Sequence, residues 1–409
     1  MKLILATNIG LVKYNFLYII IILSGVLYPS QLSGQIKFDI NIPDYINREE
    51  KVKLSSVVRN IEYIVLETTP ECLLDKDYKI ELTNEYIFIF DYLNLYRFSN
   101  TGKFLNKIGR MGRGPGEYLR LGADFAVDDV KKEVYLLDFF GNKILVHQYD
   151  GTYLREIKLQ FSGQFMSLLS NNHLVHHNIG YTYFSRNEDT YELEILDTQG
   201  KGINRLKSTL SENRRYGMIL IFPFFYHFNN KTLYKNPFND TVYNLTINNY
   251  EPYGIVSSGK FARDSRHDDF QKGGYNTDEK SIIVTGMAES QRYLFISYVR
   301  GSGQRLLFDK NTNKSVHVVT GLKNLIEEGR ETSYTKGLVN DIDGGFPFWP
   351  QKIVNDSILI DIRYAHEFKL LDESWFSNKE ILYQNRSDNL KEITKKINQF
   401  DNPILIIAK

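Results

Sequence analysis

Cysteine is almost absent from this chain of 409 residues, in which Cys72 is the only one. One thiol cannot form an intramolecular disulfide, so packing and hydrogen bonds must stabilise the fold. Cys72 also lies far from the N-terminal segment, where a lipoprotein carries its lipid-accepting cysteine. We therefore expect no lipid anchor, and we expect Cys72 to be a small buried side chain.

An excess of either charge is also missing, because 50 Lys and Arg residues face 49 Asp and Glu residues. Proteins that bind nucleic acid neutralise its phosphates with a basic surface, and attachment to an anionic membrane needs a similar surface. The composition therefore excludes the function classes that depend on a strongly basic surface. We expect no nucleic-acid partner.

No apolar run near the N-terminus is long enough to cross a membrane. Residues 16–28 (FLYIIIILSGVLY) form the longest one, and a spanning helix needs roughly 20 residues. Lys2 and Lys13 are the only charges before it, and small or polar residues (PSQLSG) follow. This arrangement is typical of a cleaved signal peptide. We predict a signal peptide over 1–34 and a mature domain over 35–409 that is periplasmic or secreted and free of the membrane; a retained anchor is the alternative.

Aromatic side chains are abundant, at 14% of the residues, and they favour strands. Three segments also share one pattern, two short runs around a glycine: FSNTGKFLNKIG (98–109), HQYDGTYLREIKL (147–159) and LDTQGKGINRLK (196–207). Their glycines, Gly102, Gly151 and Gly200, are 49 residues apart each time. A glycine in this place is typical of a hairpin turn that requires a positive φ. The chain therefore repeats a strand, turn and strand unit.

Near-continuous apolar runs that end in Asp precede two of these units, YIFIFD (86–91) and VYLLD (134–138). Apolar side chains on both faces of a strand indicate that both faces are covered, as they are in the stacked blades of a propeller. About 350 residues divided by the period give roughly seven units, and a helical tail and loop insertions leave six. We predict an all-β fold, a six-bladed β-propeller with a short C-terminal helix; seven blades is the alternative.

The two ends of the mature chain carry strand patterns. IEYIVLE (61–67) is an early apolar run, and NPILIIAK (402–409) is a final one that follows a helical pattern in SDNLKEITKKINQF (387–400), with Ser387 or Asp388 available as its N-cap. Closing a ring removes exposed strand edges. We therefore predict that the two end strands pair in one blade or lie in adjoining blades.

Four features occur in a fixed order along the chain: IEYIVLETT (61–69), GRMGRGPGEY (109–118), the glycine repeats and NDIDGGFPFWP (340–350). With them the chain resembles the exported six-bladed β-propeller proteins, related to NHL-repeat propellers, that are numerous in Bacteroides and its relatives. The resemblance covers essentially the whole mature chain and implies the fold. It implies no activity, since most members have none assigned, and fold does not fix function.

The glycine-rich motif supplies the first candidate ligand-binding residues, Arg110, Arg113 and Tyr118. Its four glycines allow backbone N–H groups to approach an anion that the arginines could pair. However, no Lys-Ser/Thr pair follows the last glycine, and Pro115 removes a donor. The alternative is an interblade loop in which Arg113 and Glu117 bond to nearby backbone.

NDIDGGFPFWP supplies the second set, Asp341, Asp343 and Trp349. Carboxylates beside aromatic faces suit sugar rings, whose hydroxyls bond to the acids while their C–H faces stack. The alternative is a glycine-rich turn with Trp349 wedged between blades.

Residues for catalysis and metal binding form no complete set. HLVHH (173–177) contains three histidines, but a metal site needs three or four ligands and no further ligand is local. No GxSxG nucleophile motif occurs. We predict no cofactor and no metal, and we assign no catalytic residue.

These observations favour a monomeric ligand-binding or protein-interaction module whose partner is an unknown small molecule, glycan or envelope protein. The alternative is a propeller enzyme, either a metal-dependent lyase or hydrolase or a carbohydrate-active enzyme.

Overall fold

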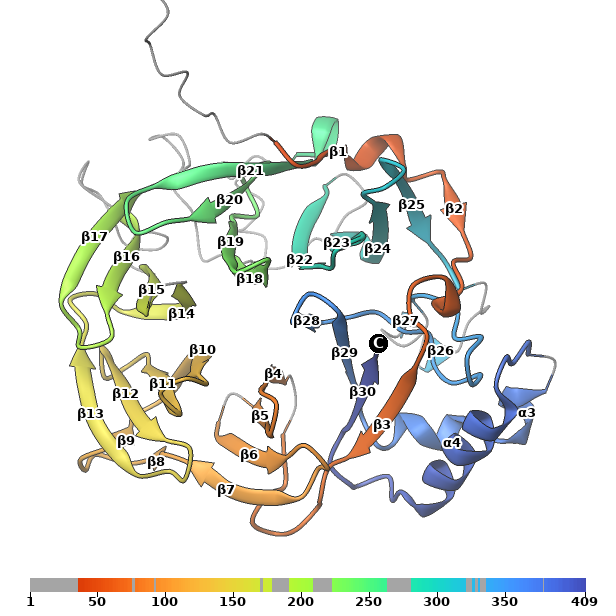
Figure 1. The fold of residues 1–409 in the computed structure, drawn as a ribbon, viewed down its shortest axis with the longest axis horizontal. Coiled ribbons are helices and arrows are strands. Elements are labelled where there is room, and N and C mark those ends of the chain that lie inside the picture. Colours follow the sequence, from red (N-terminus) through yellow and green to blue (C-terminus); the bar gives the residue numbers. More distant parts are fainter. Residues whose placement is uncertain are drawn as a thin grey trace, which may run out of the picture.

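Short runs of β-branched and aromatic residues recur along the chain, and they form strands that pair in sequence order. In the computed structural model, six four-stranded antiparallel sheets stand around a central axis as the blades of a propeller (Figure 1). The structure describes residues 36–75, 78–91, 93–169, 172–178, 191–208, 223–262, 281–320, 326–327, 330–331, 336–377 and 379–409. The predicted all-β, six-bladed fold is confirmed. The predicted signal peptide, 1–34, lies outside these residues.

We number the blades along the chain and name the strands of each blade from the channel outward (Figure 1). Blades 1 to 3 consist of β4 (Lys79–Leu82), β5 (Tyr86–Phe90), β6 (Leu95–Ser99) and β7 (Phe104–Ile108); β10 (Leu121–Asp128), β11 (Glu133–Asp138), β12 (Lys143–Gln148) and β13 (Tyr153–Lys158); and β14 (Gly163–Leu169), β15 (His173–Asn178), β16 (Tyr191–Asp197) and β17 (Gly202–Lys207). Blades 4 to 6 consist of β18 (Phe224–Phe228), β19 (Lys231–Lys235), β20 (Thr241–Leu245) and β21 (Tyr250–Ser257); β22 (Ile283–Glu289), β23 (Tyr293–Arg300), β24 (Ser302–Asp309) and β25 (Lys314–Val318); and β28 (Lys352–Val354), β29 (Ile358–Arg363), β30 (Ile404–Ala408) and β3 (Ile61–Val65).

Hydrophobic side chains fill the spaces between neighbouring blades. The buried clusters of the described residues each join two adjacent blades; the cluster between blades 1 and 2, for example, contains Phe88, Phe90 and Leu136. The runs that form β5 and β11 are buried on both faces, as predicted. Cys72 is also buried, and its thiol donates to the backbone oxygen of Glu67 at 3.1 Å.

The ends of the chain close the ring inside blade 6, as predicted. β30 and β3 pair antiparallel, from Ile61 opposite Ala408 to Val65 opposite Ile404. Blade 6 therefore takes three strands from the C-terminal part of the chain and its outermost strand from the N-terminal part.

An N-terminal strap also joins three blades. β1 (Asp39–Asn41) adds to β21 and β2 (Glu49–Glu50) adds to β25, both in parallel, before the chain enters blade 6 as β3. The outer edges of blades 4 and 5 are thereby paired. In contrast, β7, β13 and β17 are the last strands of the sheets of blades 1 to 3.

The three glycines spaced by 49 residues make the turns between the third and fourth strands of blades 1 to 3. Their φ angles are +88° at Gly102, +91° at Gly151 and +91° at Gly200, so the hairpin turns predicted from the sequence are confirmed. A Cβ on Gly102 would lie 2.3 Å from the Val65 oxygen, and one on Gly200 would lie 2.7 Å from Ile157 Cγ2. Glycine is therefore required both by the turn and by the close approach of the preceding blade.

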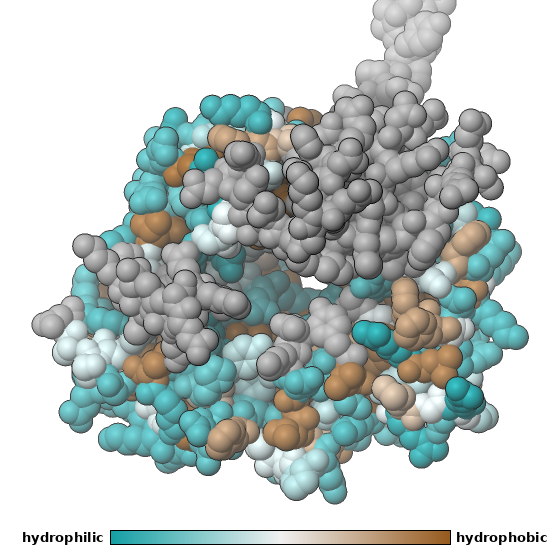
Figure 2. All heavy atoms as spheres, turned by 180° about the vertical axis from the view of Figure 1, so that it is seen from behind, coloured by the Kyte–Doolittle hydropathy of each residue, from teal (hydrophilic) through white to brown (hydrophobic). Residues whose placement is uncertain are grey.

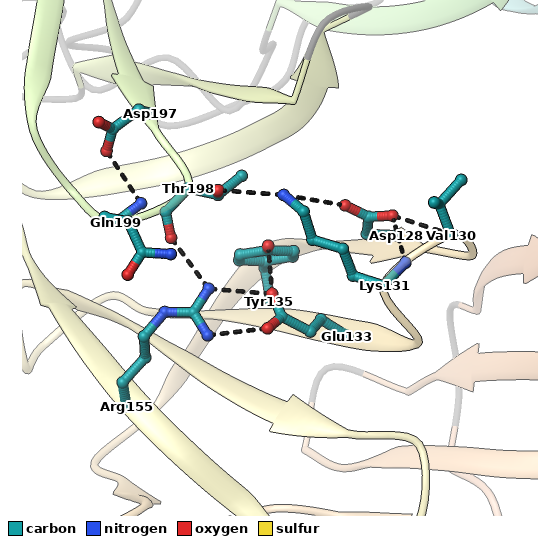
Figure 3. A network of polar contacts seen from close by, with 9 residues as sticks. All are labelled: Asp128, Val130, Lys131, Glu133, Tyr135, Arg155, Asp197, Thr198 and Gln199. Atoms are coloured by element: carbon teal, nitrogen blue, oxygen red, sulfur yellow. Dashed lines mark hydrogen bonds and ion pairs between the residues drawn. The ribbon is translucent and has the colours of Figure 1, made fainter.

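A second set of contacts, hydrogen bonds whose donors and acceptors are each spaced by 49 residues, joins these blades at their outer strands. Asn106 Nδ2 donates to the oxygen of Tyr149 at 3.2 Å, Arg155 Nη2 to that of Thr198 at 2.9 Å, and Asn204 Nδ2 to that of Ile247 at 3.0 Å. Each donor lies on the outermost strand of one blade and each acceptor lies near the turn of the next blade. Figure 3 shows the Arg155 bond, with the guanidinium also paired to Glu133.

A helix lies between β29 and β30 in the sequence and packs beside blade 6 (Figure 1). α4 spans Gln384–Lys396, whereas the sequence predicted a helix over 387–400 with Ser387 or Asp388 as N-cap. Ser387 lies inside the helix, and its N–H donates to the Tyr383 oxygen at 3.2 Å. The remaining short elements are β8 (Arg110–Met111), β9 (Glu117–Tyr118), β26 (Ile326–Glu327), β27 (Arg330–Glu331), the 3₁₀ helices η1 (Ile42–Asp44), η2 (Leu54–Ser56), η3 (Gly259–Phe261) and η6 (Glu367–Leu370), and α3 (Glu373–Phe376).

Candidate functional site

The six innermost strands line a narrow channel with a volume of about 200 Å³. Polar side chains of neighbouring blades pair across it: Lys79 with Asp124 at 2.5 Å, Lys352 with Glu81, and Ser167 Oγ with His227 Nε2 at 3.0 Å. Burial raises the pKa of Asp124, which Lys79 opposes, and burial lowers the pKa of His227 to about 4, so this histidine is neutral at pH 7. The pairs join the blades at the axis of the ring.

A larger hollow opens where the innermost strands β4 and β28 begin. We call it the mouth pocket and define it by Ser297, Arg305, Gln351, Asp361, Arg363 and Tyr364. Its volume is about 400 Å³. Tyr78 and Gln351 line both the pocket and the channel, so the two spaces adjoin. On the side of the molecule opposite to that in Figure 1, the described residues form a mainly hydrophilic surface with scattered hydrophobic side chains, and this surface is hollowed near the centre of the ring (Figure 2).

Strand pairing explains why these side chains meet. Ser297 on β23 and Arg305 on β24 are direct cross-strand partners, so they lie on the same face of blade 5. Asp361 and Arg363 are two residues apart on β29, so they share one face of blade 6. The mouth pocket lies between these two faces.

The acidic groups of the mouth pocket are held by partners within the chain. Asp361 pairs with Arg363 at 3.0 Å and accepts the N–H of Ile362 at 2.9 Å. Glu367 accepts the N–H of Tyr364 at 2.8 Å. Burial raises the pKa of both carboxyl groups, and Arg363 opposes this rise in each case. Burial lowers the pKa of Arg305 and the charge of Asp361 opposes this, but neither acid lies within ion-pair distance of Arg305.

Arg305 is the pocket residue whose charge is least compensated. Its Nη1 donates to the Gln304 oxygen at 3.1 Å, and its guanidinium lies over the Trp349 ring, 5.7 Å from the ring centre. Its Nε is buried without a hydrogen-bond partner, and no carboxylate of the described residues lies within ion-pair distance. Burial lowers the pKa of Arg305 to about 10. The group is thus charged at neutral pH and needs an anion.

The glycine-rich loop predicted to bind an anion contains its own carboxylate. Glu117 accepts from Arg110 Nε at 2.6 Å and from the N–H of Gly114 at 2.7 Å, and these bonds lower its pKa. Tyr118 is fully buried and its hydroxyl donates to the Leu93 oxygen at 3.0 Å. Arg113 is exposed. The loop joins blades 1 and 2, and its three candidate residues do not line the mouth pocket.

The other candidate carboxylates are also bonded within the chain. Asp341 accepts the N–H and hydroxyl of Ser55, at 3.0 and 2.6 Å. Asp343 accepts from Asn340 Nδ2 at 2.7 Å and from the N–H of Gly345 at 2.9 Å, and burial raises its pKa. These bonds fix the turn of the NDIDGG segment.

Trp349 is the predicted site residue that lines the mouth pocket. Its indole is only 4% exposed, it meets Phe295 edge to face at 5.2 Å, and its Nε1 donates to Ser297 Oγ at 3.0 Å. The ring face is therefore covered, which leaves little room for a sugar to stack on it. Trp349 instead positions Arg305 and Ser297.

The histidines of HLVHH lie on β15. His176 Nε2 contacts Glu194 Oε2 at 2.9 Å, and burial lowers the pKa of His177 to about 3. Among the residues that the structure describes, no group of three or more His, Cys, Asp and Glu side chains is placed to hold a metal ion.

A second hollow, of about 560 Å³, lies at the opposite end of blades 6 and 1, beside the turns that contain Asn84 and Asn355. The charges that line it are paired: Glu62 with Lys409, Glu81 with Lys352, and Asp129 with Lys132. The charged groups of this hollow are therefore less available to an incoming ion than Arg305 of the mouth pocket is.

Comparison with known proteins places the chain in a family. The model of the family described as Domain of unknown function (DUF4934) matches residues 37–409. The chain belongs to this family. No curated protein matches the DUF4934 chain. In the part of the chain that the structure describes, no helix is both long and apolar enough to cross a membrane.

Solved structures resemble the DUF4934 chain over different lengths. A Bacteroides fragilis protein described as exported matches with a TM-score of 0.66 and 21% identity, over 91% of this chain and 98% of that chain. A member of the DUF4221 family from Bacteroides vulgatus matches with 0.44 and 10% identity, over 64% and 84%, and virginiamycin B lyase from Staphylococcus aureus with 0.38 and 10%, over 63% and 73%. The first shows a shared fold, and the resemblance to exported Bacteroides propellers is confirmed; the other two carry no argument.

Proposed function

We propose that this DUF4934 protein is an exported binding module, periplasmic or secreted, that takes its ligand in the mouth pocket. The observation that carries the proposal is a pocket of about 400 Å³ beside the channel, in which no carboxylate of the described residues lies within ion-pair distance of Arg305. Pockets of this size hold small ligands, and a few polar groups orient them. Export is supported by the signal-peptide pattern over 1–34 and by the B. fragilis relative described as exported.

Two features favour binding at this end of the ring. Side chains from blades 5 and 6 converge on the pocket together with Tyr78, which precedes β4. The opposite hollow, by contrast, has charges that are already paired. No observation on the described residues favours the enzyme alternative, so the proposal is confined to binding.

The test is a thermal-shift screen of the mature chain and two tryptophan variants against glycans, sugar acids and peptides. A ligand that binds only the folded state raises the melting temperature. Gln351 and Asn84 are both exposed, so Gln351→Trp fills the mouth pocket and Asn84→Trp fills the opposite hollow. Gln351→Trp also removes the 3.3 Å bond from Gln351 Nε2 to Asp361.

The proposal predicts that the wild type and Asn84→Trp shift with the same ligand, whereas Gln351→Trp does not. A ligand that shifts Gln351→Trp as much as the wild type binds elsewhere and contradicts the assigned site. The melting temperatures without ligand serve as the control for folding.

A further inference from the structure

We infer that the ligand of the mouth pocket carries a single carboxylate, which pairs with the Arg305 guanidinium, beside hydroxyl groups of the same ligand. This inference rests on the proposed function and names the chemistry of its ligand. Sugar acids and related hydroxy acids have this combination of groups.

The guanidinium of Arg305 is held at one nitrogen and lacks an acceptor at the other two. Nη1 donates to the Gln304 oxygen, and Trp349 covers one face. Nε is buried, and no described group accepts from Nε or Nη2. Nη2 is therefore the nitrogen left for a ligand carboxylate, which a charge-assisted hydrogen bond would hold.

The chain itself shows this pairing at another arginine. Arg292 Nε contacts the two carboxylate oxygens of Asp309 at 3.3 Å each, and its Nη2 contacts Oδ2 at 2.9 Å. Arg305 lines the pocket and has no such acid among the described residues. A ligand carboxylate would therefore supply the charge that Asp309 supplies at Arg292.

The acids of the pocket favour a ligand with a single negative charge. Among the described residues that line it, Arg305, Arg363 and Lys336 are the cationic side chains, and Asp361 and Glu367 are the acidic ones. A carboxylate pairs with Arg305 and adds one negative charge near these two acids. A dianion such as phosphate would add a charge that the two acids repel.

The neutral groups of the pocket suit hydroxyls. Ser297 Oγ accepts from Trp349 Nε1, and its own O–H has no acceptor among the described residues. Gln351 is exposed at the junction with the channel. Tyr78 and Tyr364 lie 5.6 Å apart between ring centres and provide an apolar wall. A polar ring of monosaccharide size fits such a lining.

The test is a calorimetric titration of the mature chain with glucuronate, galacturonate and gluconate, with glucose and galactose as neutral partners, and with glucose 6-phosphate and sulfate. The inference predicts that at least one carboxylate binds about tenfold or more tightly than its neutral partner, as a charge-assisted hydrogen bond implies. Arg305→Met is expected to remove this difference, and Arg305→Lys to restore part of it.

Arg292→Met is the matched control, since it removes a guanidinium that Asp309 already occupies; it should leave the titrations unchanged. The melting temperature of ligand-free Arg305→Met should equal or exceed that of the wild type, because a charge without a counter-ion has been replaced by an apolar group. A lower melting temperature would assign Arg305 a structural role and overturn the inference.

Three titration results also overturn it: no carboxylate binds, phosphate or sulfate binds more tightly than the carboxylates, or a sugar and its acid bind equally. If a neutral compound binds and Gln351→Trp abolishes its binding, the proposed function stands while the carboxylate inference fails. If carboxylate binding survives in Gln351→Trp, both fail.

Discussion

Arginine residues in this chain show how one residue type serves either stability or binding. Arg155 is enclosed by partners: Glu133 accepts from both Nη1 and Nη2 at 2.9 Å, and the Thr198 oxygen accepts from Nη2 (Figure 3). Arg305 has no carboxylate partner among the described residues, and its Nη1 donates to the Gln304 oxygen. An arginine paired with a carboxylate stabilises the native state, whereas a buried one without a counter-ion destabilises it until an anion binds.

Arg155→Met is expected to lower the free energy of unfolding by roughly 1–3 kcal/mol, because Glu133 and the Thr198 oxygen lose their donor. Lys143→Met removes a more exposed pair with Glu156, at 3.3 Å, and should cost less than about 1 kcal/mol. Urea unfolding measures both values. Equal losses would contradict the role of the Arg155 network.

This loss should depend on pH. The hydrogen bond from Arg155 lowers the pKa of Glu133 in the folded state. The pair therefore contributes fully above the ordinary pKa of Glu, roughly 4.3, and its contribution is lost as the pH falls through the lowered value. The difference between wild type and Arg155→Met should be largest above about pH 5 and should shrink in acid.

At the scale of elements, turns and one closing strand determine how the blades join. The third-to-fourth strand turns of blades 1 to 3 approach the preceding blade so closely that a side chain would collide with it. β30 lies between β29 and β3, and its residues are all buried. Substitutions in these turns or in β30 are therefore expected to weaken the contacts between blades.

Gly200→Ala is expected to destabilise the protein by roughly 1–3 kcal/mol, because alanine is strained at a positive φ and its Cβ would lie 2.7 Å from Ile157 Cγ2. Gly202→Ala, two residues away, places its Cβ in open space and should change stability by less than about 0.5 kcal/mol. Thermal unfolding of both variants checks this. A neutral Gly200→Ala would show that the turn does not need glycine.

Ile406→Ala should lower the free energy of unfolding by roughly 2–4 kcal/mol, since Ile406 is 2% exposed in the closing strand. Val65→Ala changes the partner strand β3 at a residue that is 38% exposed, and it should cost less than about 1 kcal/mol.

Removing residues 402–409 should cause a large loss in melting temperature. An unchanged melting temperature after this deletion would contradict ring closure by β30.

The elements were largely predictable because their causes are local. The spacing of Gly102, Gly151 and Gly200 reflects a turn that blades 1 to 3 repeat. The apolar runs near both ends of the mature chain predict strands, and these strands pair. The helix boundary was less predictable, because Ser387 is a good N-cap in isolation but packs inside α4 against the rest of the protein.

On the scale of the whole molecule, the ring brings distant residues into one pocket. Ser297, Arg305, Trp349 and Asp361 occur on separate segments of the chain, and no local motif connects them. The sequence motifs instead marked loops whose charges are bonded internally, as Glu117 shows. Trp349 was found through its motif, but its role as a support for Arg305 depends on packing between blades 5 and 6.

The central claim is that a ligand binds in the mouth pocket, and hydrogen exchange of the mature chain tests it most directly. The protein is compared with and without the screened compound that raises its melting temperature most. The account predicts slower exchange in β23, β24 and β29, which flank the pocket, and no change in the β4–β5 turn that borders the opposite hollow. Protection of that turn, or of the outer strands β7 and β13, with unchanged exchange in β23, β24 and β29, would contradict it.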